Sequence, residues 1–457
     1  MPDLSFNRYT ALWHNRGVYI AAAKQSATKW LVVLTGLAAS MGFNAITMIV
    51  LARKITVDPT VNQFGQYLAS FSLVSFLVLW PKFGLEIWLL TRHKSSETSL
   101  IALWMSAVQA RIKLIALWVG AMLLIAIVLP GGTFPFLIFV PTILGVGIES
   151  FSTLTYASLQ VRQQHGRATL WQALSASALL GLVIALPAND NLVYLFAIGR
   201  MFISAIFALI ILLPIVQEYR RHHLTYTAFR PIIKETRPFL YNEIAGSIYT
   251  QADVSIISLF IGSAATGIYG PAINVLRMAT LTSRSFFVYI VPGLAKTFEQ
   301  DRVKFVKKSL LQLLAQIALG LSLSLFIYLF ASPIIQLVFS TGYEDSIPIL
   351  RLISPIPLLR SLNFALAAFL LAGNYQVQRS KVQIVAALFN VIMNILVIVP
   401  YGVAGVAVVY VLSESILVVG YIIYALILVK KVRSQPLVEP VLPAITEETS
   451  RACGPPP

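Results

Sequence analysis

Twelve long apolar runs dominate this sequence and limit what the chain can fold into. Each run holds roughly 18 to 28 residues, which is enough for a helix to cross the hydrocarbon core of a bilayer. The chain is 58% hydrophobic and 11% charged, whereas a soluble domain is about 45–50% apolar and about 25% charged. We therefore predict an all-α integral membrane protein with twelve transmembrane helices. The expected spans are residues 30–52, 64–90, 113–130, 134–158, 168–187, 191–216, 238–261, 266–292, 308–330, 346–372, 382–400 and 402–429.

The segments outside these runs are short or polar. A tail of residues 1–29 precedes the first span, with no cleavable signal peptide in view. The tail 430–457 contains Pro and Glu and is predicted to be disordered, and residues 98–112 are interpreted as a surface helix on the cytoplasmic side. The lone cysteine, Cys453, excludes a disulfide framework and a cysteine-based metal site.

The basic residues alternate with the spans. When the N-terminus is placed in the cytoplasm, 26 of the 34 Lys and Arg residues fall in inward-facing segments, and the outward loops hold only Arg53 and Lys54. This alternation follows the positive-inside rule, so we expect both termini in the cytoplasm. The formal charge of +16 is spread over every inward loop. It is therefore interpreted as a topology signal, and no nucleic-acid partner is expected.

An internal repeat divides the chain into two halves. "FGQYLAS" (64–70) opens the second span, and "TGIYGPA" (266–272) opens the eighth span 202 residues later. "SLQVRQQHGRATL" (158–170) and "LLAGNYQVQRSKV" (370–382) join equivalent spans at an offset near 210 residues. Six spans separate the copies, so the halves have the same orientation, as in transporters with a substrate site between parallel repeats. We predict two six-helix lobes around a central cavity: an N-lobe (30–216), a basic cytoplasmic linker (217–237) and a C-lobe (238–429).

Charged residues inside the spans are the main candidates for a functional site. A charge left in lipid costs at least about 2.5–3.5 kcal/mol on insertion scales, so these side chains are expected to face the protein interior. The cations are Lys82, Arg200, Arg277, Arg284, Arg351 and Arg360, and the acids are Glu86, Glu149, Asp253 and Glu414, with Glu243 near a helix start.

Arg277 and Arg284 are the first candidates for substrate binding. They are seven residues apart, which places them two turns apart on one helix face, and Asn274 lies one turn earlier on that side. Arginine suits a pyrophosphate because its fork donates two parallel hydrogen bonds. The alternative is structural: both arginines pair with acids between helices, or Arg284 snorkels to the cytoplasmic surface.

Two further arginines are weighed as substrate contacts. Arg360 lies mid-span after Pro355 and Pro357, which interrupt the helix and are tolerated where the backbone lines a cavity. Arg200 either contacts substrate or pairs with Glu149, which is itself a candidate for a coupling-ion site.

The remaining candidates have simple structural alternatives. Lys82 is a candidate substrate contact and Glu86 a candidate coupling-ion site, but their spacing of four residues favours a local ion pair near a kink at Pro81. Asp253 lies mid-span and is either a proton or sodium site or a hydrogen-bonded structural carboxylate. The five histidines show no metal-ligand spacing, and no catalytic residue or cofactor is expected.

The chain resembles the Wzx-type polysaccharide flippases of the multidrug/oligosaccharidyl-lipid/polysaccharide exporter superfamily. The resemblance covers about residues 28–430 and is carried by "VLARKITVDPTVNQFGQY", "QADVSIISLFIGSAATGIYGPAINVLR" and "NVIMNILVIVPYGVAGVAVVYVLSE". It implies two lobes that rock between inward-open and outward-open states. The implied substrate is an oligosaccharide on a polyprenyl pyrophosphate, moved from the cytoplasmic to the outer leaflet of a bacterial inner membrane. Membrane lipids, a polysaccharide polymerase and a chain-length regulator protein are the implied partners.

Three other functions remain open from the sequence. A drug or organic-cation antiporter of the same superfamily would favour a cavity rich in acids, and here six intramembrane cations face about five acids. A membrane enzyme such as a polysaccharide polymerase or ligase would need a large outer loop, but the outward loops hold about 3 to 15 residues. A non-transporting subunit of a polysaccharide assembly complex is the third alternative.

Overall fold

The computed structural model describes residues 35–55, 63–92, 97–221 and 229–434. The expected tail 1–29 and Cys453 lie outside these residues, as does most of the tail 430–457. Every regular element in the described part is helical, which confirms the predicted fold class. The helices are Thr35–Lys54, α2 (Gln63–Leu77), α3 (Leu79–Lys82), α4 (Leu85–Arg92), α5 (Glu97–Val128), α6 (Phe136–Val161), α7 (His165–Ala185), α8 (Leu192–Arg221), α9 (Phe229–Phe260), α10 (Ser263–Gln300), α11 (Arg302–Leu329), α12 (Ala331–Val338), the short 3₁₀ helix η1 (Thr341–Tyr343), α13 (Ser346–Ile353), α14 (Ile356–Ala372) and α15 (Gln376–Ser434).

The number of spans is consistent with twelve. Within the described residues, nine helical stretches are long and apolar enough to cross a membrane. The last of these contains two helices, because Gly402 interrupts α15 with a positive φ of 57°. This break lies at the predicted boundary between the last two spans. The two remaining expected spans correspond to α9 and α10, which carry Asp253, Arg277 and Arg284.

Two of the spans are broken helices. The second expected span consists of α2, α3 and α4, and Phe83 and Gly84 after α3 adopt positive φ angles of 49° and 67°. The tenth expected span is interrupted between α13 and α14, just before Pro355 becomes the N-cap of α14. Both interruptions lie where the sequence predicted them, near Pro81 and near the Pro355–Pro357 pair. Proline explains the second break, because Pro355 and Pro357 have no backbone N–H to donate to the preceding turn of the helix.

The prediction of a separate surface helix at residues 98–112 was wrong. These residues form the first half of the continuous helix α5. Trp104 and Arg111 in this half are fully buried, and Trp104 packs in a core with Leu89 and Leu154. The segment is buried because its apolar residues pack against α4 and α6. This packing could not be predicted from the sequence around residues 98–112.

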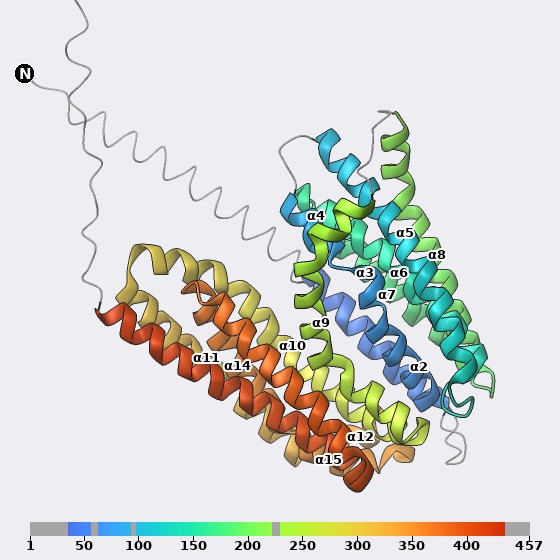
Figure 1. Cartoon of the computed structure of the whole chain (residues 1–457). Helices are drawn as coiled ribbons and strands as arrows, with labels where there is room; N and C mark the ends of the chain where they lie inside the picture. The colour runs from blue at the N-terminus through green and yellow to red at the C-terminus, as the bar shows by residue number, and fades with distance from the viewer. Residues whose placement is uncertain (1–34, 56–62, 93–96, 222–228, 435–457) are drawn as a thin grey trace, which may run out of the picture.

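The two lobes share a hydrophobic core at one end only. Figure 1 shows α2–α8 on one side and α10–α15 on the other, converging near the start of α2 and near α12. Leu51, Phe64 and Phe196 of the N-lobe form one buried cluster there with Tyr269 and Phe339 of the C-lobe. This is the end that the charge distribution assigns to the outside.

A close backbone contact joins the lobes at this end. Gly65 of α2 packs so tightly against the start of α10 that a Cβ atom at residue 65 would lie 1.9 Å from the carbonyl oxygen of Ser263. The hydroxyl of Tyr343 donates a hydrogen bond of 3.3 Å to the carbonyl oxygen of Ala52, and its ring meets Phe64 edge-on. The glycine of "FGQY" is therefore part of the seal between the lobes.

At the opposite end the lobes have separate cores. One cluster includes Leu85, Leu154 and Ile215 of the N-lobe, and another includes Phe305 and Leu428 of the C-lobe. At this basic end, the first half of α9 is the described segment that follows the N-lobe in sequence and packs against its core. A hydrophobic core therefore joins the lobes at one end, and the lobes have separate cores at the basic end.

Helix α9 begins within the segment assigned to the linker. It starts at Phe229, and its first half packs on the N-lobe, where Trp88 Nε1 donates a 2.9 Å hydrogen bond to Glu235. Ile232 is buried in the same N-lobe core. The second half of α9 packs on α2 and α15. The helix therefore runs from the N-lobe at the basic end to the junction of both lobes at the other end.

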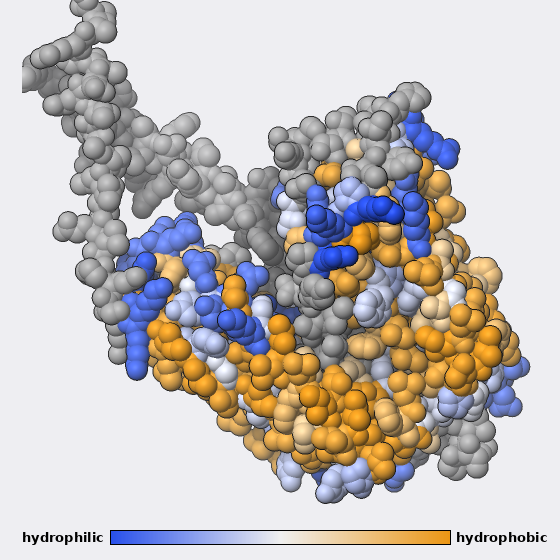
Figure 2. Space-filling view, in the orientation of Figure 1, coloured by the Kyte–Doolittle hydropathy of each residue, from blue (hydrophilic) through white to orange (hydrophobic). Residues whose placement is uncertain are grey.

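The outer surface matches a protein that is solvated by lipid. Figure 2 shows an apolar band across the middle of both lobes and hydrophilic residues gathered toward the two ends. Large apolar side chains such as Leu117, Leu124 and Val399 are exposed on this surface. In water such a surface would be an association site, but in a bilayer it is the expected contact with acyl chains.

Candidate functional site

An ion pair lies at the centre of the N-lobe. Arg200 of α8 forms a 3.1 Å ion pair with Glu149 of α6 and donates a 3.1 Å hydrogen bond to the hydroxyl of Tyr67. Its guanidinium also stacks over the ring of Phe71, 4.3 Å from the centroid. The Arg200 side chain is 7% exposed, whereas the Glu149 side chain is 48% exposed. The pairing alternative considered for Arg200 is therefore the one that the structure contains.

A second ion pair lies in the C-lobe. Arg360 Nε of α14 donates to Glu414 Oε1 of α15 across 2.6 Å, and Asn363 donates to the other carboxylate oxygen across 2.7 Å. The Arg360 guanidinium lies 5.4 Å from the ring centroid of Tyr410. Here the acid is the buried partner, because Glu414 is 1% exposed and Arg360 is 16% exposed.

The two ion pairs occupy equivalent places in the repeat with their charges exchanged. Arg360 follows Glu149 by 211 residues, and Glu414 follows Arg200 by 214, close to the offset of the sequence repeat. Each lobe thus joins its fourth and sixth spans by one buried charge and one more exposed charge. The more exposed charge is an acid in the N-lobe and a guanidinium in the C-lobe.

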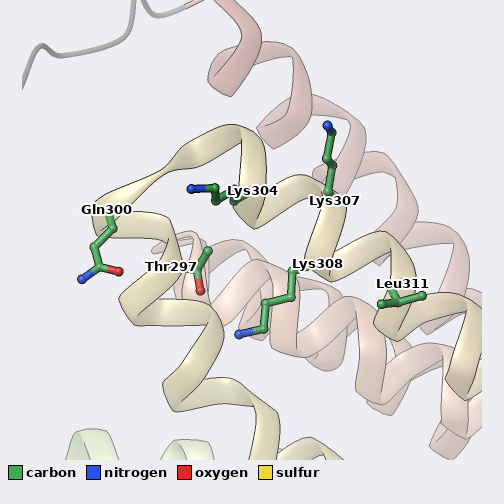
Figure 3. A pocket seen from close by; sticks show the side chains of 6 residues that line it. All are labelled: Thr297, Gln300, Lys304, Lys307, Lys308 and Leu311. Carbon is green, nitrogen blue, oxygen red and sulfur yellow. The ribbon is translucent and has the colours of Figure 1, made fainter. Parts of the chain in front are cut away.

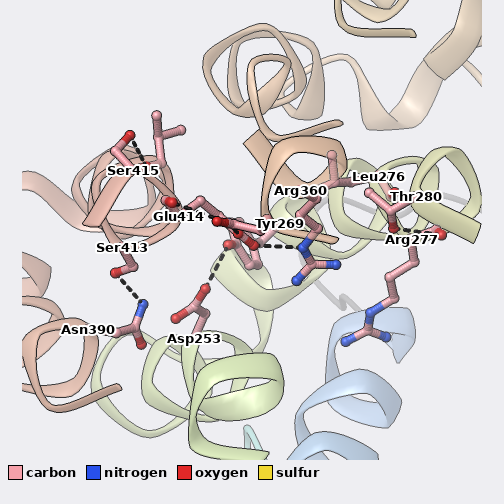
Figure 4. A network of polar contacts seen from close by, with 12 residues as sticks. Asp253, Tyr269, Leu276, Arg277, Thr280, Arg360, Asn390, Ser413, Glu414 and Ser415 are labelled. Carbon is pink, nitrogen blue, oxygen red and sulfur yellow. Dashed lines mark hydrogen bonds and ion pairs between the residues drawn. The ribbon is translucent and has the colours of Figure 1, made fainter. Parts of the chain in front are cut away.

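Arg277 and Arg284 differ from these paired residues. Both lie on α10 and both side chains are exposed. Within the part of the chain that the structure describes, neither guanidinium has an ion pair or a side-chain hydrogen bond. Both are within electrostatic reach of Arg360, which places three cations in one region. In Figure 4 the guanidinium groups of Arg277 and Arg360 turn toward the same space.

Asn274 is less accessible than its position on α10 predicted. Its side chain is 8% exposed, and its Nδ2 atom has no hydrogen-bond partner among the described residues. A buried amide donor without a partner is costly, so it is a candidate for a ligand or a water.

Asp253 lies in a buried polar cluster at the α9–α15 contact. Asn394 donates a 2.8 Å hydrogen bond to one carboxylate oxygen, and Tyr269 lies at 3.5 Å from the other. Asn394 also donates to Asn390, whose own amide group donates to Ser413. Among the described residues Asp253 has no ion-pair partner, although its side chain is 7% exposed. Figure 4 shows this cluster beside Arg360 and Glu414.

The amide residues beside Asp253 were not predicted from the sequence as part of a site. Asn390 and Asn394 are four apart in an otherwise apolar run, which places them on one helix face. That spacing was a usable signal for a polar site. The contact between Asn394 and Asp253, which are 141 residues apart, could not be predicted from this spacing.

The ion pair predicted between Lys82 and Glu86 is replaced by another. Glu86 pairs with Arg111 at 3.0 Å and accepts a 2.7 Å hydrogen bond from Thr153. The helix break at residues 83–84 removes the helical geometry that the i,i+4 pairing needed. Arg111, which lies in the segment predicted to be a cytoplasmic surface helix, is fully buried and also donates to the carbonyl oxygens of Lys82 and Ser150. Its hydrogen bond to the carbonyl oxygen of Lys82 satisfies a backbone acceptor at the end of α3. Lys82 remains within electrostatic reach of Glu86.

No cluster of three or more His, Cys, Asp or Glu residues that could hold a metal ion occurs in the described residues. The site therefore consists of arginines on one side and a carboxylate–amide cluster on the other.

Comparison with known proteins identifies the family. A family described as "Polysaccharide biosynthesis protein" matches residues 26–298, which is more than half of the chain. The chain belongs to this family. The matched region includes Arg200, Asp253, Arg277 and Arg284, and it ends before Arg360.

Two relatives and one solved structure are similar to this member of the polysaccharide biosynthesis family. The "Putative O-antigen transporter" of Escherichia coli K12 is 28% identical over 151 residues, 32% of this chain and 36% of the relative. The "Probable low-salt glycan biosynthesis flippase Agl15" of Haloferax volcanii is 21% identical over 188 residues, 41% of this chain and 40% of the relative. The chain thus matches less than half the length of either relative.

The similarity in fold extends much further. "Lipid II flippase MurJ, inward closed conformation" superposes with a TM-score of 0.70 at 14% identity, covering 88% of this chain and 90% of that chain. At this identity the similarity is one of fold. It confirms the two-lobe helical fold predicted for this member of the polysaccharide biosynthesis family.

Proposed function

We propose that this protein is an alternating-access flippase. Its substrate would be an oligosaccharide linked to polyprenyl pyrophosphate, moved from the cytoplasmic to the outer leaflet for polysaccharide biosynthesis. The observation that carries the proposal is the state of Arg277 and Arg284. They are two exposed intramembrane cations without partners among the described residues, beside a third cation, Arg360. Such charges are costly unless they line a hydrated cavity or meet an anionic ligand.

A pyrophosphate fits this arrangement. Arg277 and Arg284 stand two turns apart, roughly 10 Å along the helix axis. Each guanidinium can donate two parallel hydrogen bonds to one phosphate group, which a lysine cannot reproduce. Arg360, held by Glu414, would meet the pyrophosphate between them. The sugars would need few defined contacts, and the lipid tails would remain in the bilayer at a lateral opening.

The closed outer end and divided basic end correspond to the inward-open state of such a cycle. Substrate would enter from the cytoplasmic leaflet and reach the arginines. Rocking of the lobes would then break the contact of Gly65 with Ser263 and release the substrate outward. Outward movement of a negative charge toward the positive side is favoured by about 2.3 kcal/mol per charge per 100 mV. The membrane potential alone could therefore drive net flipping.

We assign supporting roles to the other candidate residues. Asp253, with Asn394 and Tyr269, is the proposed proton or sodium site that couples transport to an ion gradient. Arg200 and Glu149 would keep the N-lobe wall polar at mid-membrane, and the exposed carboxylate of Glu149 is the second coupling candidate. Glu86 and Lys82 stand beside the helix break, where Glu86 is bound to Arg111 and only Lys82 would reach a substrate.

We further propose a bacterial inner-membrane location with both termini in the cytoplasm. The alternation of basic segments supports this orientation. A polysaccharide polymerase and a chain-length regulator would act on the product at the outer face, so they are the expected partner proteins.

A small-molecule antiporter is the second candidate. The buried carboxylate of Asp253, which lacks a cationic partner among the described residues, favours it, because an organic cation could be that partner. A proteoliposome assay separates the two. The flippase transports a fluorescent polyprenyl pyrophosphate disaccharide, measured by dithionite quenching, and does not transport ethidium. Uptake of ethidium without movement of the lipid probe would reverse the assignment.

A further inference from the structure

The turn between α10 and α11 encloses an open hollow away from the arginines described above. It has a volume of about 490 Å³ and is lined by Thr297, Gln300, Lys304, Lys307, Lys308 and Leu311. Figure 3 shows the three lysines on the first turns of α11, with Lys304 and Lys308 directed toward the end of α10 and Lys307 directed away from it. The hollow lies at the basic end of the molecule, which is the cytoplasmic end in the orientation proposed above.

Positive charge in this hollow exceeds the negative charge nearby. Lys304 is the only one of the three lysines with an ion pair in the described residues, at 3.4 Å from Asp301, and it is 78% exposed. The Asp301 carboxylate is occupied as a helix cap, because it accepts 2.9 Å hydrogen bonds from the backbone amides of Lys304 and Val303. These hydrogen bonds, that from Lys304 above all, hold the pKa of Asp301 below its usual range, so the cap remains ionised. The lining of the hollow thus contains three lysines and no acid, and Asp301 beside it pairs with Lys304.

One of these lysines approaches α10 at a glycine. The Lys308 ammonium lies 3.6 Å from the position that a Cβ atom at Gly293 would occupy. Lys308 therefore reaches across to α10 where that helix has no side chain. Any long side chain at residue 293 would enter the space that the ammonium group now occupies.

The hollow faces lipid and not the central cavity. Gly293 follows Arg284 by nine residues, which is two and a half turns of an α-helix. The two residues therefore lie on opposite sides of α10. Next to the hollow, Leu310, Leu311 and Leu314 of α11 are 56%, 70% and 55% exposed. In a bilayer such leucines contact acyl chains.

We propose that this hollow binds the phosphate headgroup of an anionic phospholipid of the inner leaflet. Lys304, Lys307 and Lys308 would bind the phosphate, and the acyl chains would lie along Leu311 and Leu314. Basic residues at the inner membrane surface attract anionic lipids, and basic pockets between transmembrane helices bind their headgroups. The site is separate from the substrate arginines and does not depend on the proposed flippase function.

Native mass spectrometry of the full-length protein in detergent tests this site. The probes are phosphatidylglycerol, phosphatidylcholine and inorganic phosphate. Wild type is expected to retain phosphatidylglycerol in preference to phosphatidylcholine, and excess inorganic phosphate should not displace it, because the leucine face adds affinity for acyl chains. The Lys304→Gln/Lys307→Gln/Lys308→Gln variant should weaken phosphatidylglycerol binding on the order of a hundredfold, because each basic residue near the surface contributes roughly a factor of five.

Two variants control for charge and for folding. Arg220→Gln/Arg221→Gln/Arg230→Gln removes three exposed cations from the same end of the N-lobe and should leave the retained lipid unchanged. Gly293→Leu keeps every charge and fills the space beside Lys308, and it should weaken binding as the lysine variant does. Equal loss in the arginine control, equal retention of both lipids by wild type, or unchanged binding in Gly293→Leu would each overturn the proposal.

Discussion

Arg360 Nε and Glu414 Oε1 are 2.6 Å apart in the C-lobe, and this contact has a counterpart of opposite polarity in the N-lobe, where Arg200 meets Glu149 at 3.1 Å. In the C-lobe the acid is buried and the guanidinium is the more exposed partner. In the N-lobe the guanidinium is buried and the acid is half-exposed. The repeat has therefore kept the ion pair between its fourth and sixth spans and exchanged the charge that faces the interior.

This exchange predicts opposite stability rankings in the two lobes. In the C-lobe, Arg360→Gln should destabilise more than Glu414→Gln, because it leaves Glu414 buried without its cation. In the N-lobe, Glu149→Gln should destabilise more than Arg200→Gln, because it leaves Arg200 buried. The larger effects should approach about 3–5 kcal/mol, as for a buried pair that loses one partner. The effect of Arg200→Gln should remain within about 1 kcal/mol, as for an exposed charge, and the effect of Glu414→Gln should be smaller than that of Arg360→Gln.

Thermal unfolding midpoints of the four purified variants in one detergent check these rankings. The comparison is internally controlled, since every variant carries one Gln in place of one charge. The same order of acid and base in both lobes would contradict the exchanged arrangement.

The contact at Gly65 predicts that a single methyl group opens the outer end. A Cβ atom there would lie 1.9 Å from the Ser263 carbonyl oxygen, whereas a Cβ atom at Gly181 would meet nothing within 4 Å. In a Cys453→Ser background, Ala272→Cys is buried in the shared core and should resist an impermeant thiol reagent added from outside. Adding Gly65→Ala should increase its labelling several-fold, and adding Gly181→Ala should not. Equal protection of residue 272 in both variants would show that the Gly65 contact does not hold the outer end closed.

Asp253 should control the response of transport to an ion gradient. Its carboxylate accepts a 2.8 Å hydrogen bond from Asn394 and has no ion-pair partner in the described residues, so binding a proton or sodium would compensate its charge. Flipping in proteoliposomes is expected to respond to an imposed pH or sodium gradient in wild type. Asp253→Asn should abolish that response while potential-driven flipping persists. A response of wild-type size in Asp253→Asn would remove this residue from coupling.

The topology can be tested with single cysteines in the Cys453→Ser background. Asn189→Cys and Glu344→Cys lie in segments assigned to the outside, and His223→Cys and Lys304→Cys in segments assigned to the cytoplasm. An impermeant thiol reagent added to whole cells should label the first two only. Labelling confined to residues 223 and 304 would reverse the orientation.

The sequence was sufficient for features that depend on local periodicity. Twelve apolar runs predicted the helical membrane fold, and the break between the last two spans was placed at the residue where Gly402 adopts a positive φ. The prolines before Arg360 correctly predicted an interrupted helix. Pairing of Arg200 with Glu149 was open as an alternative because few intramembrane acids were available.

The sequence did not reveal features that depend on packing between distant segments. Arg111 was placed in a surface helix, since nothing near it in sequence shows that Glu86 and the Ser150 carbonyl group lie around it. The contact between Asp253 and Asn394 joins α9 to α15. Likewise, the exposure of Arg277 and the burial of Asn274 depend on the neighbours of α10 and not on its own periodicity.

The central claim is that Arg277 and Arg284 bind pyrophosphate and are not structural. Both are exposed and unpaired among the described residues, so neutralising them should change the unfolding midpoint little, as for other exposed residues. Lysine at these positions should retain partial activity, because it supplies charge without the bidentate fork.

The most direct measurement is the flipping rate of a fluorescent polyprenyl pyrophosphate disaccharide in proteoliposomes containing Arg277→Gln/Arg284→Gln. Arg220→Gln/Arg221→Gln is the matched control, which removes two exposed arginines at the end of α8. We predict that the α10 variant is folded, with an unchanged unfolding midpoint, and loses flipping by at least about a hundredfold, while the control flips at the wild-type rate. Wild-type flipping by the folded α10 double variant would contradict the account.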